Sequence, residues 1–155
     1  MSNPTIQHKV SLADFYVTEL IFNAPSPGSK FGEGLSFTLE HATSYNNEID
    51  DKRFFIAFNL NITNSSKDFS LKLTALAAFI TDQKINDEFM SSHFPNVNCP
   101  AIAFPYIRSY VTNVISSSGY QPIYLPSINF SIKQNEAEIN LNKSRGSISL
   151  NKKKK

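Results

Sequence analysis

Apolar and polar residues alternate most regularly in two neighbouring stretches, residues 54–63 and 69–80. The first places one set of apolar side chains on a single face: Phe54, Ile56, Phe58, Leu60 and Ile62. The second does the same with Phe69, Leu71, Leu73, Ala75, Ala77 and Phe79. A period of two is typical of a strand with one buried face, and the polar residues 64–68 suit a hairpin connection. The pattern predicts an antiparallel pair of strands.

Two earlier stretches extend this sheet. Residues 13–25 are rich in β-branched and aromatic side chains and end at the turn signal Pro25-Ser26-Pro27-Gly28. Residues 35–40 again have period two, with Leu35, Phe37 and Leu39 alternating with polar residues. Both stretches favour β-strands, and the hairpin indicates that the sheet is antiparallel.

The period changes after Thr81. Residues 87–90 favour a short helical turn that ends before Pro95, and a longer helix follows. Its apolar stripe has helical spacing: Ile107, Tyr110, Val111, Val114 and Ile115. Pro105 suits the first turn of this helix and Gly119 the position just past its end. The residues alone thus indicate antiparallel strands followed by one good helix.

The sheet shows apolar residues on both of its faces. Phe54 and Phe55 are adjacent, and Leu76, Ala78 and Ile80 lie opposite the main apolar face of their strand. Such a sheet needs cover on both sides. The helix supplies one cover, and the other is a second subunit, a nonpolar client segment or the C-terminal part of the chain itself.

Length and charge narrow the class of protein. A chain of 155 residues suits one domain. It has 15 Lys and Arg against 13 Asp and Glu, but four of the lysines are residues 152–155, so the rest has a net charge of 11 − 13 = −2. An acidic body argues against a nucleic-acid-binding fold. No apolar run reaches the roughly 18 residues of a membrane span, and the first nine residues lack a signal pattern.

Candidate catalytic chemistry is sparse. Cys99 is the single cysteine, which excludes an intrachain disulfide and favours a reducing cytoplasm. A thiol–imidazole pair between Cys99 and His93 is conceivable, but a small buried cysteine and a surface histidine explain both residues more simply. Gly28, Gly32 and Gly34 lack the strand-to-helix context of a phosphate loop. We expect no enzyme activity, no metal and no cofactor.

One segment resembles the signature of the SecB protein-export chaperone family. Residues 98–108 read Asn-Cys-Pro-Ala-Ile-Ala-Phe-Pro-Tyr-Ile-Arg, similar to the family pattern of Cys-Pro, a few apolar residues, Phe-Pro-Tyr, one residue and Arg. Gly119, Tyr120, Pro122 and the run Leu-Pro-Ser-Ile-Asn-Phe at residues 125–130 also match. The end of the first predicted strand, residues 22–25, is similar to the family's aromatic-x-Ala-Pro. The resemblance covers about residues 13–130.

The resemblance implies an assembly as well as a fold. It implies an α+β fold with a four-stranded antiparallel sheet, a long helix and a crossover loop through residues 119–129. It also implies a second helix, which weak patterning after Phe130 leaves open. Family members assemble as homotetramers, dimers of dimers, and are ATP-independent holdases in the cytoplasm that bind non-native polypeptide in hydrophobic grooves. The expected organisation is a flexible N-terminus at 1–12, one domain at 13–142 and a basic, disordered tail at 143–155.

Matching positions supply the candidate client-binding residues. Four lie in the crossover loop: Tyr120, Ile123, Tyr124 and Leu125. Phe37 and Leu39 of the second predicted strand are weaker candidates. For all six, packing in the core is an equally good explanation of the sequence.

The departures from the family pattern indicate which branch of the family to expect. Export members present acids on the outer sheet face to dock the motor ATPase SecA. Here Glu19 keeps one acid, but Asn23 and Lys72 stand where acids are expected and the tail is basic. These changes resemble SecB-like chaperones of toxin–antitoxin–chaperone systems, in which the client is an antitoxin. The alternatives are a general export chaperone that delivers unfolded preproteins to SecA, and a structural oligomer without a client.

Overall fold

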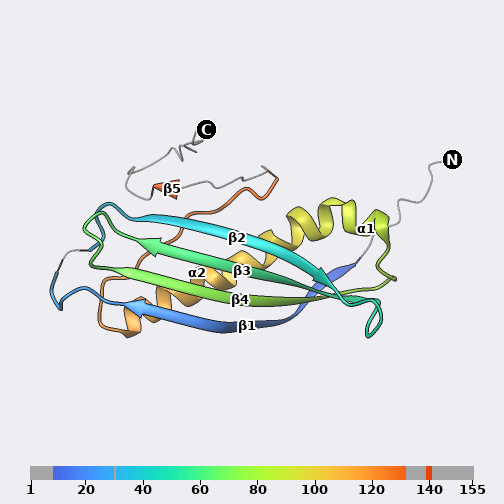
Figure 1. Cartoon of the computed structure of the whole chain (residues 1–155), viewed down its shortest axis with the longest axis horizontal. Helices are drawn as coiled ribbons and strands as arrows, with labels where there is room; N and C mark the ends of the chain where they lie inside the picture. Colours follow the sequence, from blue (N-terminus) through green and yellow to red (C-terminus); the bar gives the residue numbers. More distant parts are fainter. Residues whose placement is uncertain (1–8, 30, 132–138, 141–155) are drawn as a thin grey trace.

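The computed structural model describes residues 9–29, 31–131 and 139–140 of the chain. Four long strands form the sheet: β1 (Val10–Asn23), β2 (Ser36–Tyr45), β3 (Arg53–Thr63) and β4 (Ser70–Thr81). A two-residue strand, β5 (Ile139–Asn140), pairs with β2, so the order across the sheet is β1-β4-β3-β2-β5 and every pair is antiparallel. The predicted α+β class and the four antiparallel strands are confirmed (Figure 1).

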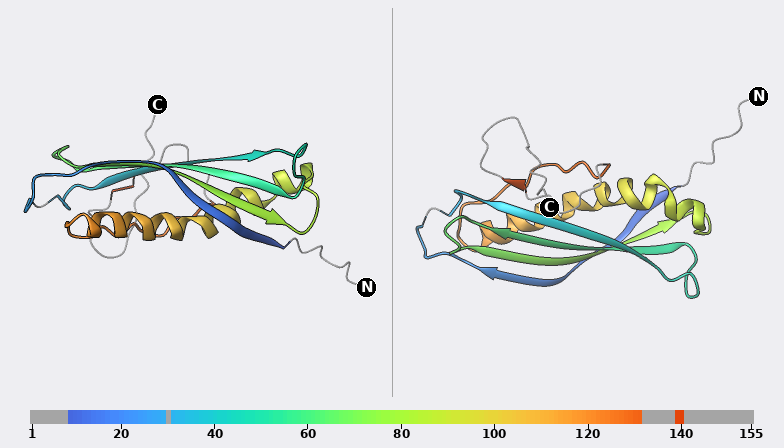
Figure 2. Two further views of the ribbon diagram at one scale, coloured as in Figure 1. Left: turned by 90° about the horizontal axis from the view of Figure 1, so that it is seen from below. Right: turned by 45° about the horizontal axis from the view of Figure 1, so that its top comes forward.

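The long helix α2 (Cys99–Ser117) lies along one face of the sheet, which we call the inner face (Figure 2). The predicted apolar faces of β3 and β4 both point towards it, and their side chains are almost fully buried. From the helix side, Ile107, Val111 and Ile115 are fully buried. Each buried Phe, Leu or Ile side chain contributes roughly 1.5–3 kcal/mol, so this layer is the main source of stability.

β1 keeps its apolar side chains on the inner face although they are not spaced by two. Leu12, Phe15, Val17, Leu20 and Phe22 pair with inner-face positions of β4. Register shifts between Leu12 and Asp14 and between Val17 and Glu19 insert one extra residue each time. Such bulges restore the alternation after each irregular spacing.

The helical region begins earlier than the sequence indicated. The short helix α1 (Asp87–Ser91) is confirmed, and the Asn86 side chain accepts a hydrogen bond from the Phe89 N–H at 2.9 Å. A short π-helix, η1 (Phe94–Asn98), then runs directly into α2. The expectation that Pro105 occupies the first turn is wrong, because Pro100 takes that place and Pro105 lies inside the helix. Pro105 and Ala101 are both exposed, so water can bind the carbonyl group that loses its N–H partner.

The predicted end of α2 at Gly119 is confirmed. Gly119 has a φ of 89°, a left-handed conformation that glycine adopts without steric cost. Its N–H donates to the Ser116 carbonyl at 3.1 Å, and the Tyr120 N–H donates to the Ile115 carbonyl at 3.2 Å. This pair of hydrogen bonds is a Schellman motif, which satisfies the last carbonyls and turns the chain into the crossover segment.

The two ends of the expected domain fall partly outside the described residues. β1 begins at Val10, so the sheet starts three residues before the expected boundary at residue 13. The possible second helix and the basic tail lie on residues that the structure describes only at 139–140, where the chain forms β5.

No described residue of the C-terminal part covers the outer face, the side of the sheet away from α2. The outer face has two halves. The apolar half holds Tyr16, Phe55, Ala57, Leu76 and Ile80, and the polar half holds Glu19, Asn59, Asn61, Lys72 and Thr74. Tyr16 is 50% exposed and Ile80 is 40% exposed.

Candidate functional site

The crossover segment, residues 119–131, runs in extended conformation back along α2. Its side chains alternate between the core and solvent because neighbours in an extended chain point to opposite sides. Ile123 and Leu125 are 6% and 1% exposed, whereas Tyr124 between them is 74% exposed. Phe130, further along, is buried against Phe104, with ring centroids 5.8 Å apart.

Three side-chain contacts hold this segment in place. The Thr112 hydroxyl donates to the Ile123 carbonyl at 2.8 Å, and Arg108 donates to the Ser127 hydroxyl at 3.4 Å. At the other end, the Tyr120 hydroxyl donates to the Pro25 carbonyl at 2.8 Å. The Tyr120 ring also packs edge-on against Phe22 and Phe31. Tyr120 therefore joins the crossover segment to the end of β1.

A hollow of about 640 Å³ lies between the crossover segment and the β1–β2 loop. Its apolar lining comes from Phe31, Leu35 and Ile123, and Tyr120 and Tyr124 line it as well. Glu33 contributes a carboxylate, and Gly28 and Gly32 leave backbone accessible beside it. An open hollow with aromatic walls and exposed backbone suits an extended, partly apolar peptide.

A second hollow, of about 290 Å³, lies on the other side of Tyr124. It is lined by Leu125 and by one side of α2: Pro105, Arg108, Ser109, Thr112 and Asn113. Tyr124 lines both hollows, so its exposed ring stands on the ridge between them.

The six sequence candidates occupy different environments in this chain. Tyr120, Ile123, Tyr124 and Leu125 all line one or both hollows, although Ile123 and Leu125 do so from largely buried positions. Phe37 is 1% exposed and Leu39 is partly buried against the core; neither lines either of the two hollows. The role of the six in client binding stays a prediction.

Sequence reasoning missed the β1–β2 loop as part of this site. Phe31 lies among Gly28, Gly32 and Gly34, which the sequence suggests only as a phosphate loop, and Leu35 is assigned from sequence to the second predicted strand. Gly34 has a φ of 67°, and a β-carbon there would overlap the Ser65 side chain. A large apolar residue such as Phe31 within a glycine-rich loop is the signal that could have identified the hollow.

The described ionisable groups near the inner face show no catalytic arrangement. Burial raises the pKa of Cys99 to about 12, so its thiol is neutral and unreactive near neutral pH. Partial burial lowers the pKa of His41, whose ring lies 6.0 Å from that of Phe58 and 5.6 Å from that of Phe130. Among the described residues there is no cluster of three metal-ligating side chains. No helix in the described part of the chain is long and apolar enough to cross a membrane.

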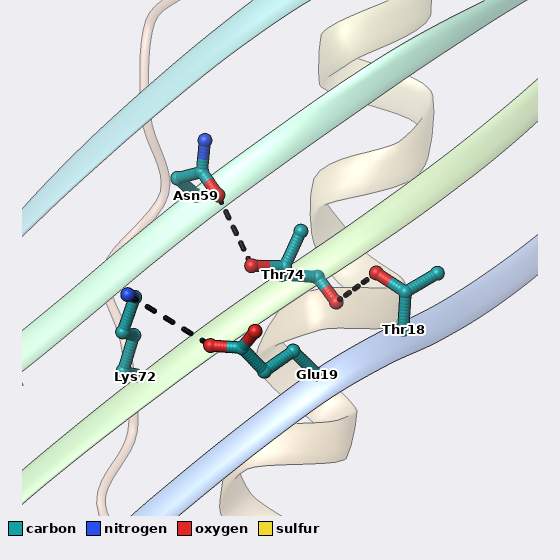
Figure 3. Close-up of polar contacts among 5 residues, drawn as sticks. All are labelled: Thr18, Glu19, Asn59, Lys72 and Thr74. Atoms are coloured by element: carbon teal, nitrogen blue, oxygen red, sulfur yellow. Dashed lines mark hydrogen bonds and ion pairs between the residues drawn. The ribbon is translucent and has the colours of Figure 1, made fainter.

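The polar half of the outer face is the second surface of functional interest. Lys72 of β4 approaches Glu19 of β1, with Nζ and Oε1 3.8 Å apart (Figure 3). Beside them the Thr74 hydroxyl donates to Asn59 Oδ1 at 3.1 Å, and the Thr18 hydroxyl donates to the Thr74 carbonyl at 3.2 Å. Glu19, the acid that matches the family pattern, is thus paired with a lysine.

Comparison with protein families gives a match over residues 3–137 to the family described as SecB, preprotein translocase subunit SecB. The protein-export protein SecB of Magnetococcus marinus is 28% identical over 138 residues, covering 81% of this chain and 80% of that protein. The protein-export protein SecB 2 of Polaromonas naphthalenivorans is 28% identical over 123 residues, covering 74% of this chain and 72% of that protein.

A solved structure has a similar fold. It is the SecB-like chaperone of Mycobacterium tuberculosis in complex with a ChAD peptide from the HigA1 antitoxin. The match has a TM-score of 0.62 at 15% identity and covers 77% of this chain and 90% of that one. At this identity the likeness concerns the fold alone.

Proposed function

The chain belongs to the SecB family of chaperones, and on this premise we propose that it is an ATP-independent holdase for non-native polypeptide. The observation that carries the proposal is the pair of hollows on either side of the exposed Tyr124. An exposed aromatic ring between two partly apolar hollows can bury apolar client side chains at roughly 25 cal/mol per Å², with little demand on their identity. The SecB family is not a family of enzymes, and we propose no catalytic role for Cys99.

Suppression of aggregation tests the holdase function. The full-length chain should keep a chemically unfolded test protein from aggregating after dilution, without ATP. Tyr124→Ala should weaken binding of the unfolded protein about tenfold, equivalent to ~1.4 kcal/mol. Tyr16→Ala is the control, because Tyr16 is a 50% exposed tyrosine on the outer face that lines neither hollow. Wild-type chain that fails to suppress aggregation would instead support a structural oligomer without a client.

We further propose that the client is an antitoxin in a toxin–antitoxin–chaperone system. The supporting observation is the pairing of Glu19 with Lys72, which neutralises an acid at the surface where export members dock SecA. Reversed charge at a docking surface disfavours the former partner by repulsion as well as by lost attraction. The ChAD-bound structure adds support, since a SecB-like chaperone of similar fold binds an antitoxin peptide.

A pull-down from the native host distinguishes the two branches. We expect an antitoxin encoded next to this gene to co-purify with the chaperone, and we expect no measurable binding of SecA. The alternative is a general export chaperone in the cytoplasm, which predicts bound preproteins and SecA. Lys72→Glu should raise SecA binding if charge at this surface decides between the branches, whereas Lys67→Glu, in the β3–β4 turn, is the control.

Self-association into a tetramer belongs to the same proposal. On α2, Ile102 and Tyr106 are 42% and 52% exposed, and the Tyr106 ring lies beside β1, with its centroid 5.6 Å from that of Phe15. Large exposed apolar side chains on a helix favour contact with a second copy. Light scattering should give about 70 kDa for four chains of 17.4 kDa, and Tyr106→Glu should reduce that mass. A monomer at all concentrations would contradict the assembly.

A further inference from the structure

The two hollows beside Tyr124 carry opposite charges. Among the residues that line them, all within the described part of the chain, the larger hollow has one charged side chain, Glu33, and the smaller has one, Arg108. Each also has an apolar wall, from Ile123 in the larger hollow and Leu125 in the smaller. A ligand that contacts both hollows therefore meets a carboxylate, an exposed tyrosine ring and a guanidinium, in that order.

The Arg108 guanidinium keeps donors for a further partner. It has five N–H groups, and its contact among the described residues is a single long hydrogen bond of 3.4 Å to the Ser127 hydroxyl. The ion pairs between described residues use the cations Arg53, Lys72 and Lys84 instead. A planar guanidinium matches the two oxygens of a carboxylate, so an acidic side chain suits the smaller hollow.

Glu33 lies on a loop whose flanking residues are fixed. Phe31 and Leu35, two positions before and after it, are each 5% exposed. The Phe31 ring lies 4.9 Å from that of Phe69, and the Phe31 carbonyl accepts a hydrogen bond from Asn64 Nδ2 at 3.5 Å. The exposed carboxylate thus stands beside an apolar wall. Lys or Arg suits this place, because the carbon stem packs on apolar surface while the charged head reaches the carboxylate.

The crossover segment sets the order of the two sites. Residues 119–124 line the larger hollow and residues 124–125 the smaller, so the path from one hollow to the other follows the chain. Figure 1 shows the β1–β2 loop and the start of the crossover segment at the same end of the sheet. Six extended residues span about 20 Å, enough to cross two hollows of these volumes.

We propose that Glu33 and Arg108 fix the direction in which a client segment lies across Tyr124. This inference rests on the proposed holdase function and specifies which segments are preferred. Such a segment has apolar or aromatic residues at its centre, Lys or Arg at one end and Asp or Glu at the other. Its basic end lies beside Glu33 and its acidic end beside Arg108, because the opposite placement brings like charges together.

Binding of three peptides to the full-length chain tests the charge preference. The probes are ten-residue peptides that share a centre of two Val and two Phe and have Ser and Gly ends. One has Lys before the centre and Asp after it, the second has Lys at both places and the third Asp at both. The mixed peptide should bind about threefold to fivefold more tightly than the other two at low salt, and 0.5 M salt should remove most of this preference.

Charge reversal at either hollow should change the preferred peptide. Glu33→Lys makes both hollows positive, so the peptide with two Asp should bind most tightly. Arg108→Glu makes both negative, so the peptide with two Lys should. Glu48→Lys, in the exposed β2–β3 turn, adds the same charge elsewhere, and Ser127→Ala removes the hydrogen bond of Arg108 but not its charge; both controls should keep the preference for the mixed peptide.

A nitroxide label on the peptide N-terminus reports the direction of binding. With Lys before the centre, the label should broaden the amide resonances of residues 31–35 more than those of residues 108–113. With Lys and Asp exchanged, the order of broadening should invert. In the double variant Glu33→Lys with Arg108→Glu, each peptide should show the inverse of its behaviour with the native chain.

Each outcome decides the question. Preference for the mixed peptide together with inverted broadening supports the inference. Equal binding of the three peptides, broadening that ignores charge order, or binding of unfolded protein without binding of any peptide overturns the inference and leaves the holdase function standing. If Arg108→Glu does not fold, Arg108→Gln replaces it and should reduce the preference for Asp without reversing it. If neither the peptides nor the unfolded test protein binds, the proposed function fails and this inference with it.

Discussion

The two faces of the sheet are built from alternate residues of the same strands, yet they differ sharply in cover. On the inner face, Phe54, Phe58 and Phe79 are at most 1% exposed beneath α2 and the crossover segment. The outer face instead carries Tyr16 and Ile80, 50% and 40% exposed, at one end and the polar group around Lys72 at the other. The inner face thus accounts for the stability of the single chain.

The outer face carries paired polar groups and exposed apolar side chains rather than a packed layer. In its polar half, charges and hydroxyls are paired across strands, as Figure 3 shows for Glu19 and Lys72. In its apolar half, Arg53 reaches across β4 to Asp14, with Nη2 and Oδ2 2.6 Å apart, and its guanidinium lies 5.7 Å from the centre of the Phe55 ring. This difference in cover between the two faces indicates that the inner-face residues must be apolar for folding, whereas the outer-face residues need not be.

Substitution of adjacent residues on β4 gives the largest expected contrast. Phe79→Ala removes a fully buried ring and should lower the free energy of unfolding by about 3–5 kcal/mol. Ile80→Ala, at a site that is 40% exposed, should lower it by less than about 1 kcal/mol. Urea unfolding at two protein concentrations measures both. If Ile80→Ala lowers the free energy of unfolding nearly as much as Phe79→Ala, the two faces do not differ in cover, and the outer face is covered in the assembly.

The reaction rate of a thiol tests how well the helix-covered side of the sheet is shielded from solvent compared with the outer face. With its pKa raised to about 12, Cys99 is about 10⁻⁴ ionised at pH 8, whereas an ordinary exposed cysteine with a pKa near 8.5 is about one quarter ionised. The matched variant is Ala42→Cys combined with Cys99→Ser, which moves the single thiol to an exposed position on the outer face of β2. Native Cys99 should react with a disulfide reagent at least about 10³-fold more slowly than the thiol of this variant. Reaction followed by absorbance, with and without denaturant, checks this, and fast reaction of native Cys99 would mean that α2 opens readily.

The strands could be predicted because burial of one face of a strand requires an apolar residue at every second position of the sequence. The inner positions of β3 and β4 alternate without interruption, so period two was sufficient. The start of α2 could not be predicted, because both Pro100 and Pro105 satisfy the same local rule for a first turn. The π-helix at residues 94–98, which packs Pro95 into the core, places Pro100 and not Pro105 at the start of α2.

The candidate site was predictable as a segment but not residue by residue. The crossover loop was identified from its resemblance to the family, and it does line both hollows. Its alternation, with Tyr124 outside and Ile123 and Leu125 inside, depends on how Thr112 and Tyr120 hold the loop against neighbouring elements. Those contacts join residues up to 95 positions apart in the sequence, so no local sequence pattern predicts them.

The pH dependence of the free energy of unfolding tests the edge of the inner face, where His41 lies. Burial by Phe58 and Phe130 lowers the pKa of His41 in the folded state, so the unfolded chain takes up the proton first as the pH falls. Stability should decline as the pH falls below about 6.5, the ordinary histidine pKa, and level off below the folded pKa. Urea midpoints between pH 7.5 and 5.5 should show a small decline that His41→Gln abolishes. His93→Gln, at the start of η1, should leave the decline in place. If both variants abolish the decline equally, His41 is not its cause.

The smallest effect is expected in the polar half of the outer face. Lys72 and Glu19 are about half exposed and 3.8 Å apart, so solvent screens their attraction. Lys72→Ala should change the free energy of unfolding by no more than about 0.5 kcal/mol, and 0.5 M salt should remove even that difference. Thr74→Ala, which breaks the neutral contact with Asn59, is the control because salt should not alter its effect. If Lys72→Ala lowers the free energy of unfolding by more than about 1 kcal/mol independently of salt, this ion pair is buried in the assembly. The polar half of the outer face would then contribute to stability as the covered inner face does.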